Sequence, residues 1–421
     1  MLDFLHCRPN ATVRCRPPAP APRSLLVRNI LTGMLLLLVT LGASACAFEY
    51  DDGPVAEDEW SEDSTYAATG SGVKVFESGY SSKMGTTLFY RIPSIVTIRK
   101  SGVVVAFAER RVGSNEDSGN VDVVYRYSRD DGSTWSKIHV LCNLGSNKCG
   151  NPTAVVDQRS EVIHVFMASN PGHLSQLSDD PDDRIGQGDR HIKYATVRIT
   201  PTGPNKSALK DMTQQVGLPS APYDLVGPGV GIQLTSGPHR DRLLIPALRR
   251  TIYSDDGGKT WKKSPLMANG GSETAIVELS DGRIYRSDRP TGSMRDLHRR
   301  VVSFSSDGGK TFSTPSAAKG LVDPVCQGSL LRYAPQRILF ANCKSTTNRK
   351  DLTIRWGVTA RDFSKGLKID SECGYSSMTK TNDFHVAILY EENNRSISGS
   401  RKLPKNLVLR KFKVKKIVDA P

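Results

Sequence analysis

One octapeptide pattern occurs three times in the chain and restricts the folds that it can form. The pattern Ser-x-Asp-x-Gly-x-Thr-aromatic lies at Ser128–Trp135, Ser254–Trp261 and Ser305–Phe312. Its Asp can accept hydrogen bonds from turn N–H groups, its Gly can adopt a positive φ, and its aromatic ring can pack beneath the turn. Each copy therefore predicts a structural turn after a β-strand and not a catalytic motif.

The spacing of the three copies predicts a repeat architecture. The copies begin 126 and 51 residues apart. Steps of about 50 to 60 residues, with one unmarked repeat between the first two copies, are within the range of four-stranded propeller blades. Residues 71–421 would then hold six such units. We therefore predict an all-β fold, a six-bladed β-propeller.

The apolar residues favour strands over helices along the whole of this region. They occur in short bursts enriched in β-branched residues, and a helical period over a dozen residues is hard to find. The 36 Gly and 24 Pro supply turns between them. The bursts that we expect to be strands are Ser94–Ile98, Val103–Ala108, Val121–Tyr127, Ala154–Val156, Val162–Met167, Leu243–Leu248 and Val301–Phe304.

The first 47 residues have the pattern of a targeting segment. Arginines precede an apolar run from Asn29 to Leu41, and small residues follow it. This predicts a signal peptide cleaved after Ala45 or Ala47, or an uncleaved signal anchor that attaches the chain to a membrane through residues 29–47. A lipid-modified Cys46 is a further alternative. Residues 48–70 are acidic with few apolar positions, which predicts a linker that cannot form a core.

Five cysteines follow Cys46, and export would permit disulfides between them. The sequence separations favour the pairs Cys142–Cys149 and Cys326–Cys343, which would leave Cys373 as a free thiol. No Cys or His spacing suggests a zinc site, so we predict neither a metal nor another cofactor.

The octapeptide resembles the Asp box of sialidases, and the other motifs of that family follow in order along the chain. Phe89–Pro93 resembles the Arg-Ile-Pro signature that opens the family's catalytic domain, and Gly374–Met378 resembles its nucleophile segment. The resemblance covers roughly residues 73–400 and is closest to bacterial and lysosomal-type sialidases. It implies an exo-α-sialidase that removes terminal sialic acid from glycoproteins, glycolipids and oligosaccharides with retention of configuration.

The resemblance also implies residues that would bind the substrate. Three arginines would hold the substrate carboxylate: Arg91, Arg289 and Arg355. Arg111 would lie near the 4-hydroxyl of the sugar, and Glu391 would orient Arg91. The second arginine has competitors nearby in the sequence, namely Arg283, Arg286, Arg295, Arg299 and Arg300.

Three further residues would carry the reaction. The resemblance makes Tyr375 the nucleophile, Glu273 its general base and Asp117 the acid/base, with Glu116 a rival for Asp117. Sialic acid bears a carboxylate on its anomeric carbon, which planar, permanently charged guanidiniums suit. A carboxylate nucleophile would be repelled by that group, whereas a neutral phenol activated by a base would not.

Two other functions share these features. A trans-sialidase would use the same groups but transfer the sugar to an acceptor, and a sialic-acid-binding lectin would have lost Tyr375 or Asp117. A net charge of +14 raises nucleic acid as a partner, but the basic residues form no runs, so we predict sialylated glycoconjugates and no nucleic acid. We expect the chain in the secretory pathway, as an extracellular, membrane-anchored or lysosomal protein.

Overall fold

The computed structural model describes residues 72–420, apart from 177, 222, 360–362 and 394–403. All of these residues belong to one unit of the chain, Thr69–Pro421. The predicted targeting segment and the acidic linker, residues 1–70, lie outside the described residues. Within the described residues, no helix is long and apolar enough to cross a membrane.

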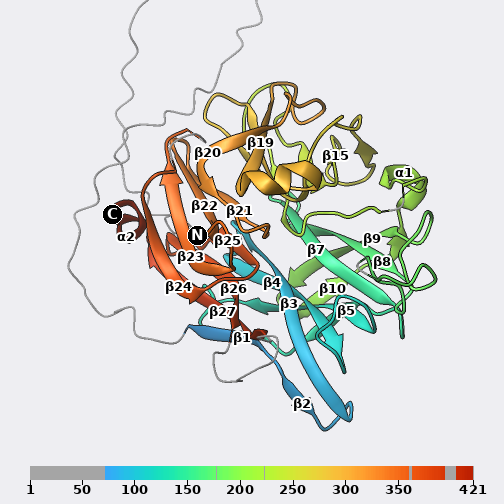
Figure 1. Ribbon diagram of the computed structural model, residues 1–421. Helices are drawn as coiled ribbons and strands as arrows, with labels where there is room; N and C mark the ends of the chain where they lie inside the picture. The colour runs from blue at the N-terminus through green and yellow to red at the C-terminus, as the bar shows by residue number, and fades with distance from the viewer. Residues whose placement is uncertain (1–71, 177, 222, 360–362, 394–403, 421) are drawn as a thin grey trace, which may run out of the picture. The chain divides into compact units, whose positions relative to one another are not determined.

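The described part of the chain forms an all-β, propeller-like fold, as predicted (Figure 1). Four of its sheets have four strands each. They contain β13 (Ile232–Gln233), β14 (Leu243–Ala247), β15 (Arg250–Ser254) and β16 (Lys262–Lys263); β17 (Ser272–Glu278), β18 (Ile284–Arg289), β19 (Arg299–Ser305) and β20 (Ser316–Val322); β21 (Ser329–Ala334), β22 (Arg337–Cys343), β23 (Lys350–Gly357) and β24 (Gly366–Glu372); and β25 (Ser376–Lys380), β26 (His385–Asn393), β27 (Pro404–Lys413) and β1 (Val73–Glu77).

The remaining sheet has eleven strands and contains the first half of the fold. Its main path runs β10-β9-β8-β7-β5-β4-β3-β2, with β6, β11 and β12 paired beside it. These strands are β2 (Gly79–Ser81), β3 (Thr86–Ile98), β4 (Val103–Val112), β5 (Val121–Ser128), β6 (His139–Cys142), β7 (Lys148–Asp157), β8 (Val162–Asn170), β9 (His191–Thr200), β10 (Gly203–Lys206), β11 (Lys210–Asp211) and β12 (Gly229–Val230). The helical elements are short: α1 (Thr213–Val216), the 3-10 helix η1 (Gly292–Leu297) and α2 (Val414–Val418).

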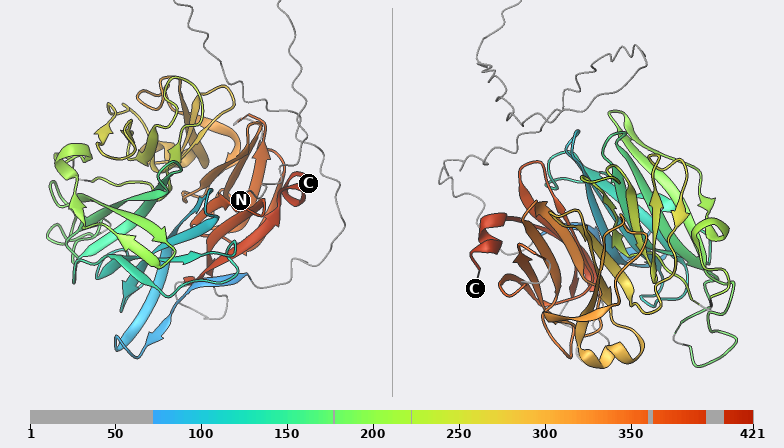
Figure 2. Two further views of the ribbon diagram at one scale, coloured as in Figure 1. Left: turned by 180° about the vertical axis from the view of Figure 1, so that it is seen from behind. Right: turned by 90° about the horizontal axis from the view of Figure 1, so that it is seen from above.

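The sheets stand side by side, and the apolar cores lie between neighbouring sheets (Figure 2). One core joins Leu352 and Ile354 of β23 to Ile388 of β26. Another joins Val104 and Ala106 of β4 to the last sheet, so the two ends of the folded unit meet. Both faces of these strands are buried, which explains why they read as apolar bursts without strict alternation. Strand β1 completes the last sheet by pairing with β27.

Each octapeptide forms the predicted turn at the end of a strand. In the first copy, the Asp130 carboxylate accepts hydrogen bonds from the backbone N–H and the hydroxyl of Thr134, at 2.8 and 2.6 Å. Gly132 has φ +90° and donates its N–H to the Ser128 hydroxyl. Burial acts to raise the pKa of Asp130, but hydrogen bonds from Ser128 and Thr134 lower this pKa to about 2. The other two copies repeat these bonds, so the motif stabilises turns.

One disulfide is as predicted and the other is not. Cys142 is bonded to Cys149, but Cys343 is bonded to Cys373 and not to Cys326. Cys343 ends β22 and Cys373 follows β24 of the same sheet, which brings their Cα atoms within 5.5 Å. Cys326 is the buried free cysteine among the described residues. Sequence separation alone does not reveal which strand ends lie side by side in a sheet.

Candidate active site

The predicted catalytic residues lie at one end of the sheets. Neighbouring antiparallel strands place the start of one beside the end of the next. Glu273 at the start of β17 therefore lies close to Arg289 at the end of β18, where Ser272 pairs with Arg289. Arg91 of β3 lies likewise beside the end of β4, since it pairs with Glu109.

Bulges redirect the innermost strands at this end. The register shifts in β3 between Arg91 and Ser94, and in β17 between Ser272 and Ala275. Each shift contains a residue in the left-handed region, Ile92 with φ +57° and Glu273 with φ +45°. Such conformations are uncommon for non-glycine residues and occur where a strand is bent to aim a side chain. The bulge at Glu273 turns its carboxylate toward Tyr375.

The Tyr375 phenol lies between a carboxylate and a guanidinium. Its hydroxyl donates a hydrogen bond to Glu273 Oε1, and Arg289 Nη1 donates to the same hydroxyl at 3.1 Å. Arg289 Nη1 also lies 2.7 Å from Glu273 Oε1. Burial and the Glu273 carboxylate raise the pKa of Tyr375 well above its usual value, while Arg289 opposes them. The phenol is therefore neutral and already placed beside a proton acceptor.

Glu391 joins Arg91 to the segment that carries Tyr375. Its Oε1 accepts from Arg91 Nε and from the Ile92 N–H, both at 3.1 Å, and its Oε2 accepts from the Tyr375 N–H at 3.2 Å. Burial alone would lower the pKa of Arg91, but the Glu391 and Asp117 carboxylates raise it. Arg91 stays charged, and its Cζ lies 5.6 Å from the centre of the Tyr375 ring.

Asp117 lies in an exposed loop beside two arginines. Its Oδ1 is 2.7 Å from Arg111 Nη2 and 3.6 Å from Arg91 Nη1, and its side chain is 64% exposed. Arg111, Lys148 and Arg91 together hold the pKa of Asp117 below its usual range, although burial acts in the opposite direction. Its neighbour Glu116 contributes a backbone carbonyl to Arg111. The structure thus brings the Asp117 carboxylate to the arginines.

Arg289 is distinguished by its contacts from three of its competitors, Arg283, Arg286 and Arg300. Arg286 and Arg300 are buried and bind backbone carbonyls and acids inside the fold, and Arg283 pairs with Asp281 at the surface. Arg289 contacts both Tyr375 and Glu273.

The structure does not bring Arg355 to this cluster, which corrects the prediction for the third arginine. Its side chain is 1% exposed, and its guanidinium donates to the Gly320 carbonyl and to Asn342 Oδ1, both at 2.8 Å. Arg349, just before β23, lies here instead, with its Cζ 5.6 Å from the centre of the Tyr375 ring. Arg355 comes five residues after the start of β23, about 16 Å along a strand.

Comparison with known proteins identifies the family. An exo-alpha-sialidase of Aspergillus fumigatus is 33% identical over 362 residues, which cover 79% of this chain and 86% of that protein. The chain belongs to the sialidase family. A sialidase of Micromonospora viridifaciens is 28% identical, with 72% of this chain and 50% of that protein covered. The sialidases are glycoside hydrolases, and the BNR repeat-like domain model matches residues 237–388.

Solved structures of sialidases share the fold. A NanB sialidase of Streptococcus pneumoniae superposes with a TM-score of 0.70 at 18% identity and covers 84% of this chain and 72% of its own. An intramolecular trans-sialidase of the leech gives 0.69 at 17% identity, covering 83% and 71%. At these identities the likeness concerns the sialidase fold alone.

Sequence reasoning missed several polar residues of this sialidase cluster. Arg190 is 6% exposed, its Cζ lies 4.9 Å from the Tyr223 ring centre, and its Nε and Nη1 have no hydrogen-bond partner among the described residues. Burial raises the pKa of Tyr223 to about 12, and the charges of Arg190, Glu273, Arg289 and Asp117 also act on it. These two residues lie in loops and strand ends without a motif, so no sequence signal identified them.

Lys148 anchors the loop that carries Asp117 in the candidate site. Its Nζ donates to the Asp117 carbonyl at 2.7 Å, and its side chain is 5% exposed. Burial lowers the pKa of Lys148 to about 8, although the Glu109 and Asp117 carboxylates partly oppose this shift. The charged lysine is therefore costly to bury, and the loop carrying Asp117 depends on it.

We expect Lys148→Met to change both the pH dependence of stability and the activity. The folded pKa, about 8, lies below the reference value of 10.5, so the unfolded chain binds the proton more strongly between these values. The wild type should therefore gain stability as the pH rises from about 8 to 10.5, by on the order of 3 kcal/mol, and Lys148→Met should lose this gain. Urea unfolding of both proteins from pH 7 to 10.5 measures the difference.

The control is Lys259→Met, which replaces an exposed lysine in an octapeptide turn. It should unfold with the wild-type pH dependence. At pH 6, Lys148→Met should lower kcat/KM about tenfold, because Asp117 loses an anchoring hydrogen bond. An unchanged pH dependence of stability would show that Lys148 does not titrate in this range.

Proposed function

We propose that this sialidase-family chain is an exo-α-sialidase that acts on terminal sialic acid of glycoconjugates with retention of configuration. The observation that carries the proposal is the hydrogen bond between Tyr375 and Glu273, beside three guanidiniums. The exo-alpha-sialidase of Aspergillus fumigatus supports the activity and the substrate class.

The three guanidiniums would bind the substrate carboxylate. Arg91 and Arg349 lie at equal distances from the Tyr375 ring, and Arg289 contacts its hydroxyl. Glu391 uses both of its oxygens to position Arg91 and the Tyr375 backbone. A planar carboxylate placed between these groups would accept charge-assisted hydrogen bonds from each arginine. Its anomeric carbon would then face the phenol.

The first step would form a covalent bond from Tyr375 Oη to the anomeric carbon. Glu273 would take the phenolic proton as attack proceeds, because the raised pKa of Tyr375 keeps the phenol neutral before attack. Asp117 would give a proton to the leaving oxygen as the bond to the aglycone breaks. In the second step Asp117 would take a proton from water, which attacks the same carbon as the bond from that carbon to Tyr375 Oη breaks, and Glu273 would return the proton to the phenol.

The low pKa keeps Asp117 deprotonated in the free protein, which is the state that accepts a proton from water in the second step. For the first step Asp117 must carry a proton, and binding of the anionic substrate would favour this. The substrate carboxylate would offset the positive charge of Arg91, and the bound sugar would exclude water from a side chain that is 64% exposed. Both effects raise the pKa of a carboxyl group. The low pKa also predicts that activity increases toward acidic pH.

We further infer a six-bladed propeller and export. The eleven-stranded sheet divides naturally into two blades, with β3–β6 in one and β7–β10 in the next, and four further sheets complete six. The octapeptides follow β5, β15 and β19, the third strands of blades one, three and four, which supports one unmarked blade between the first two copies. Two disulfides support an oxidising compartment. A signal peptide or anchor in residues 1–47 and a linker at 48–70 remain part of this proposal.

The test is hydrolysis of 4-methylumbelliferyl α-sialoside by the full chain, followed by proton NMR of the released sugar. We expect fluorophore release and the α-anomer as the first product. First appearance of the β-anomer would contradict the tyrosine mechanism, and binding of the sialoside without release would favour the lectin. Added lactose should not become sialylated; sialyllactose as the main product would make the protein a trans-sialidase.

A further inference from the structure

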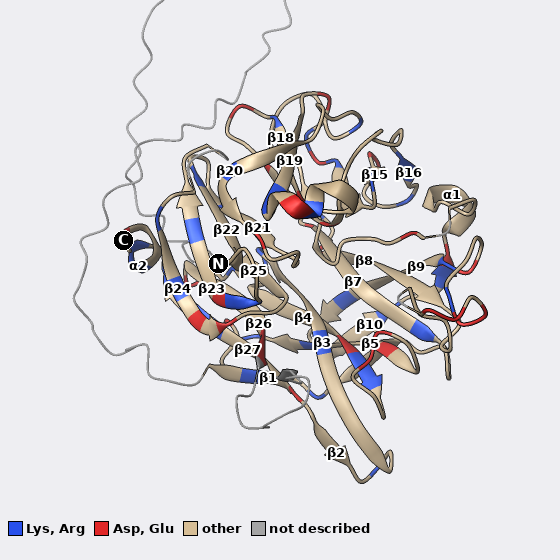
Figure 3. Cartoon of the chain, in the orientation of Figure 1, with Lys and Arg blue, Asp and Glu red and all other residues tan. Residues whose placement is uncertain are grey.

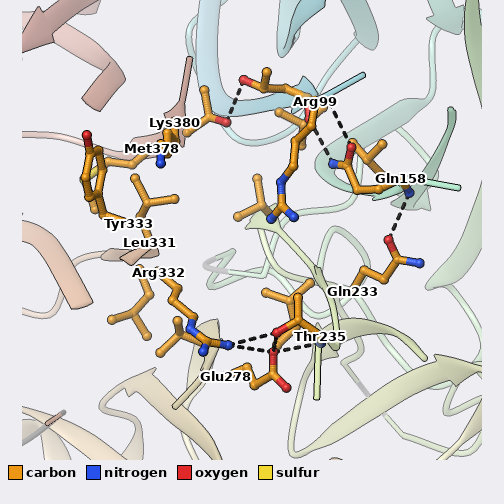
Figure 4. Close-up of a pocket in the computed structure, with 18 of the residues that line it drawn as sticks. Arg99, Gln158, Gln233, Thr235, Glu278, Leu331, Arg332, Tyr333, Met378 and Lys380 are labelled. Atoms are coloured by element: carbon orange, nitrogen blue, oxygen red, sulfur yellow. Dashed lines mark hydrogen bonds and ion pairs between the residues drawn. The ribbon is translucent and has the colours of Figure 1, made fainter. Parts of the chain in front are cut away.

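A cavity lies at the opposite end of the innermost strands, away from Tyr375. It has a volume of about 680 Å³ and is lined by residues of β3, β7, β13, β17, β21 and β25 (Figure 4). Arg91 of β3 belongs to the catalytic cluster, and Arg99, which directly follows β3 eight residues later, lines this cavity, about 26 Å away at the rise of a strand. We refer to it as the Arg99 cavity. Its size is within the range of small-molecule sites.

Three cations but only one carboxylate line the Arg99 cavity: Arg99, Arg332 and Lys380 with Glu278. Figure 4 shows Arg99 extending into the space between these residues, whereas Arg332 extends toward Glu278 and Thr235. Glu278 is already fully used, because its oxygens accept from Arg332 Nη1 at 2.9 Å and from the backbone and hydroxyls of Thr235 and Ser236. Arg332 is thereby neutralised.

Arg99 and Lys380 remain without a carboxylate partner among the described residues. The Arg99 backbone is fixed by Gln158 and Asn382, which leaves its guanidinium free to point into the cavity. Burial lowers the pKa of Arg99, and the charge of Arg332 lowers it further; burial and Arg99 do the same for Lys380. These two cations therefore repel their neighbours, and an anion between them would relieve the repulsion.

The Arg99 cavity also has an apolar side. The Lys380 ammonium lies 4.5 Å from the centre of the Tyr333 ring and 5.0 Å from that of Phe384. Phe384 is 68% exposed, which is unusual for a large apolar side chain. Half-buried Ile232 and Leu331 continue this wall. Two unpaired cations beside aromatic and aliphatic groups suit a ligand with an anionic head and an apolar body.

Basic side chains are distributed over all of the sheets. Figure 3 shows Lys and Arg on every sheet, mixed with Asp and Glu. Some of them have acidic partners, such as Lys193 with Asp211 and Lys368 with Asp351. What sets Arg99 and Lys380 apart is that both line one cavity together with the aromatic side chains of Tyr333 and Phe384.

We propose that the Arg99 cavity binds a small organic anion, with its carboxylate or phosphate between Arg99 and Lys380 and its apolar part against Tyr333 and Phe384. This site is separate from the proposed catalytic site and does not depend on it. Titration calorimetry of the full chain with hexanoate, inorganic phosphate and hexan-1-ol tests the proposal. We expect hexanoate to bind, phosphate to bind at least about tenfold more weakly, and hexan-1-ol not to bind measurably.

The variants separate this cavity from the arginines around Tyr375. Arg99→Gln with Lys380→Gln should weaken hexanoate binding at least about tenfold and leave sialoside hydrolysis unchanged. The control Lys259→Gln and the catalytic-cluster variant Arg289→Ala should keep this binding. Binding that survives the double substitution, or that is lost only in Arg289→Ala, overturns the proposal. Equal affinity for phosphate and hexanoate overturns the organic ligand and leaves a phosphate site.

Discussion

Tyr375→Phe is expected to lower kcat for sialoside hydrolysis by at least about a thousandfold while the chain stays folded. The substitution removes the oxygen that Glu273 and Arg289 contact and nothing else. Phenylalanine fills the same space, and Glu391 still accepts a hydrogen bond from the backbone N–H of residue 375. Loss of activity would therefore show that the covalent bond to the anomeric carbon is no longer formed. Steady-state kinetics on 4-methylumbelliferyl α-sialoside, with circular dichroism to confirm the fold, measures it.

Tyr390→Phe is the matched control for this prediction. Tyr390 lies on β26, directly opposite Ser376, and is also buried. Its hydroxyl donates to Asp370 and not to the catalytic cluster. We expect kcat within about twofold of the wild type, with only a small loss of stability from the missing hydrogen bond. Equal losses in both variants would mean that Tyr375 acts by packing and would contradict its role as nucleophile.

Substrate binding should survive Tyr375→Phe. Arg91, Arg289 and Arg349 keep their charges, so the affinity for the sialoside should change little while turnover is lost. Calorimetric titration of the variant with the uncleaved sialoside measures this affinity directly. A large loss of both affinity and turnover would mean that the substitution disturbs the arginines, and it would contradict a role of the hydroxyl in bond formation alone.

The fold could be predicted because its information is local and repeated. Asp130, Gly132 and Thr134 form their turn within one octapeptide, so the sequence alone contains every partner. The spacing of the copies then indicated repeats of one size. The disulfide of Cys343 depends instead on which strand ends meet within a sheet, and nothing near Cys343 in the sequence encodes that.

The candidate site could be predicted only where a motif carried it. Tyr375, Glu273 and Asp117 stand in recognisable segments, and the structure brings their side chains to one end of the fold. The bulges that aim them could not be foreseen, because a β-branched residue such as Ile92 rarely has a positive φ. Lys148 was missed since it belongs to an ordinary strand and acts through a backbone carbonyl.

Strand direction explains why Arg355 lies away from the Tyr375 cluster. In each four-stranded sheet the starts of the first and third strands and the end of the second lie at the same edge. Glu273 and Arg289 follow this rule, and so does Arg349 at the start of the third strand β23. An arginine in the middle of β23, such as Arg355, cannot reach that edge. The motif Leu352–Trp356 lies on this strand, but its Arg355 lies inside the fold, and Arg349 lies near the Tyr375 ring.

Arg349→Lys is therefore expected to lower kcat/KM by about a hundredfold or more, whereas Arg355→Lys should lower stability and not catalysis. Lysine keeps the charge at position 349 but loses the planar fork that a carboxylate pairs with. At position 355 the guanidinium joins the Gly320 carbonyl to Asn342 inside the fold, and a buried ammonium cannot reach both. The expected cost is about 2–3 kcal/mol of unfolding free energy.

The two substitutions are chemically identical. A loss of kcat/KM in Arg349→Lys and a loss of stability in Arg355→Lys would therefore assign substrate binding to the first arginine and folding to the second. Kinetics at 25 °C and urea unfolding should be measured on both variants and on the wild type. Arg349 is exposed, so its replacement should leave the unfolding midpoint unchanged. If instead Arg355→Lys raised KM strongly without loss of stability, then Arg355 would reach the substrate in the bound state. The rule of strand direction would then fail for this sheet, because catalysis would have to move β23 along its axis by several residues.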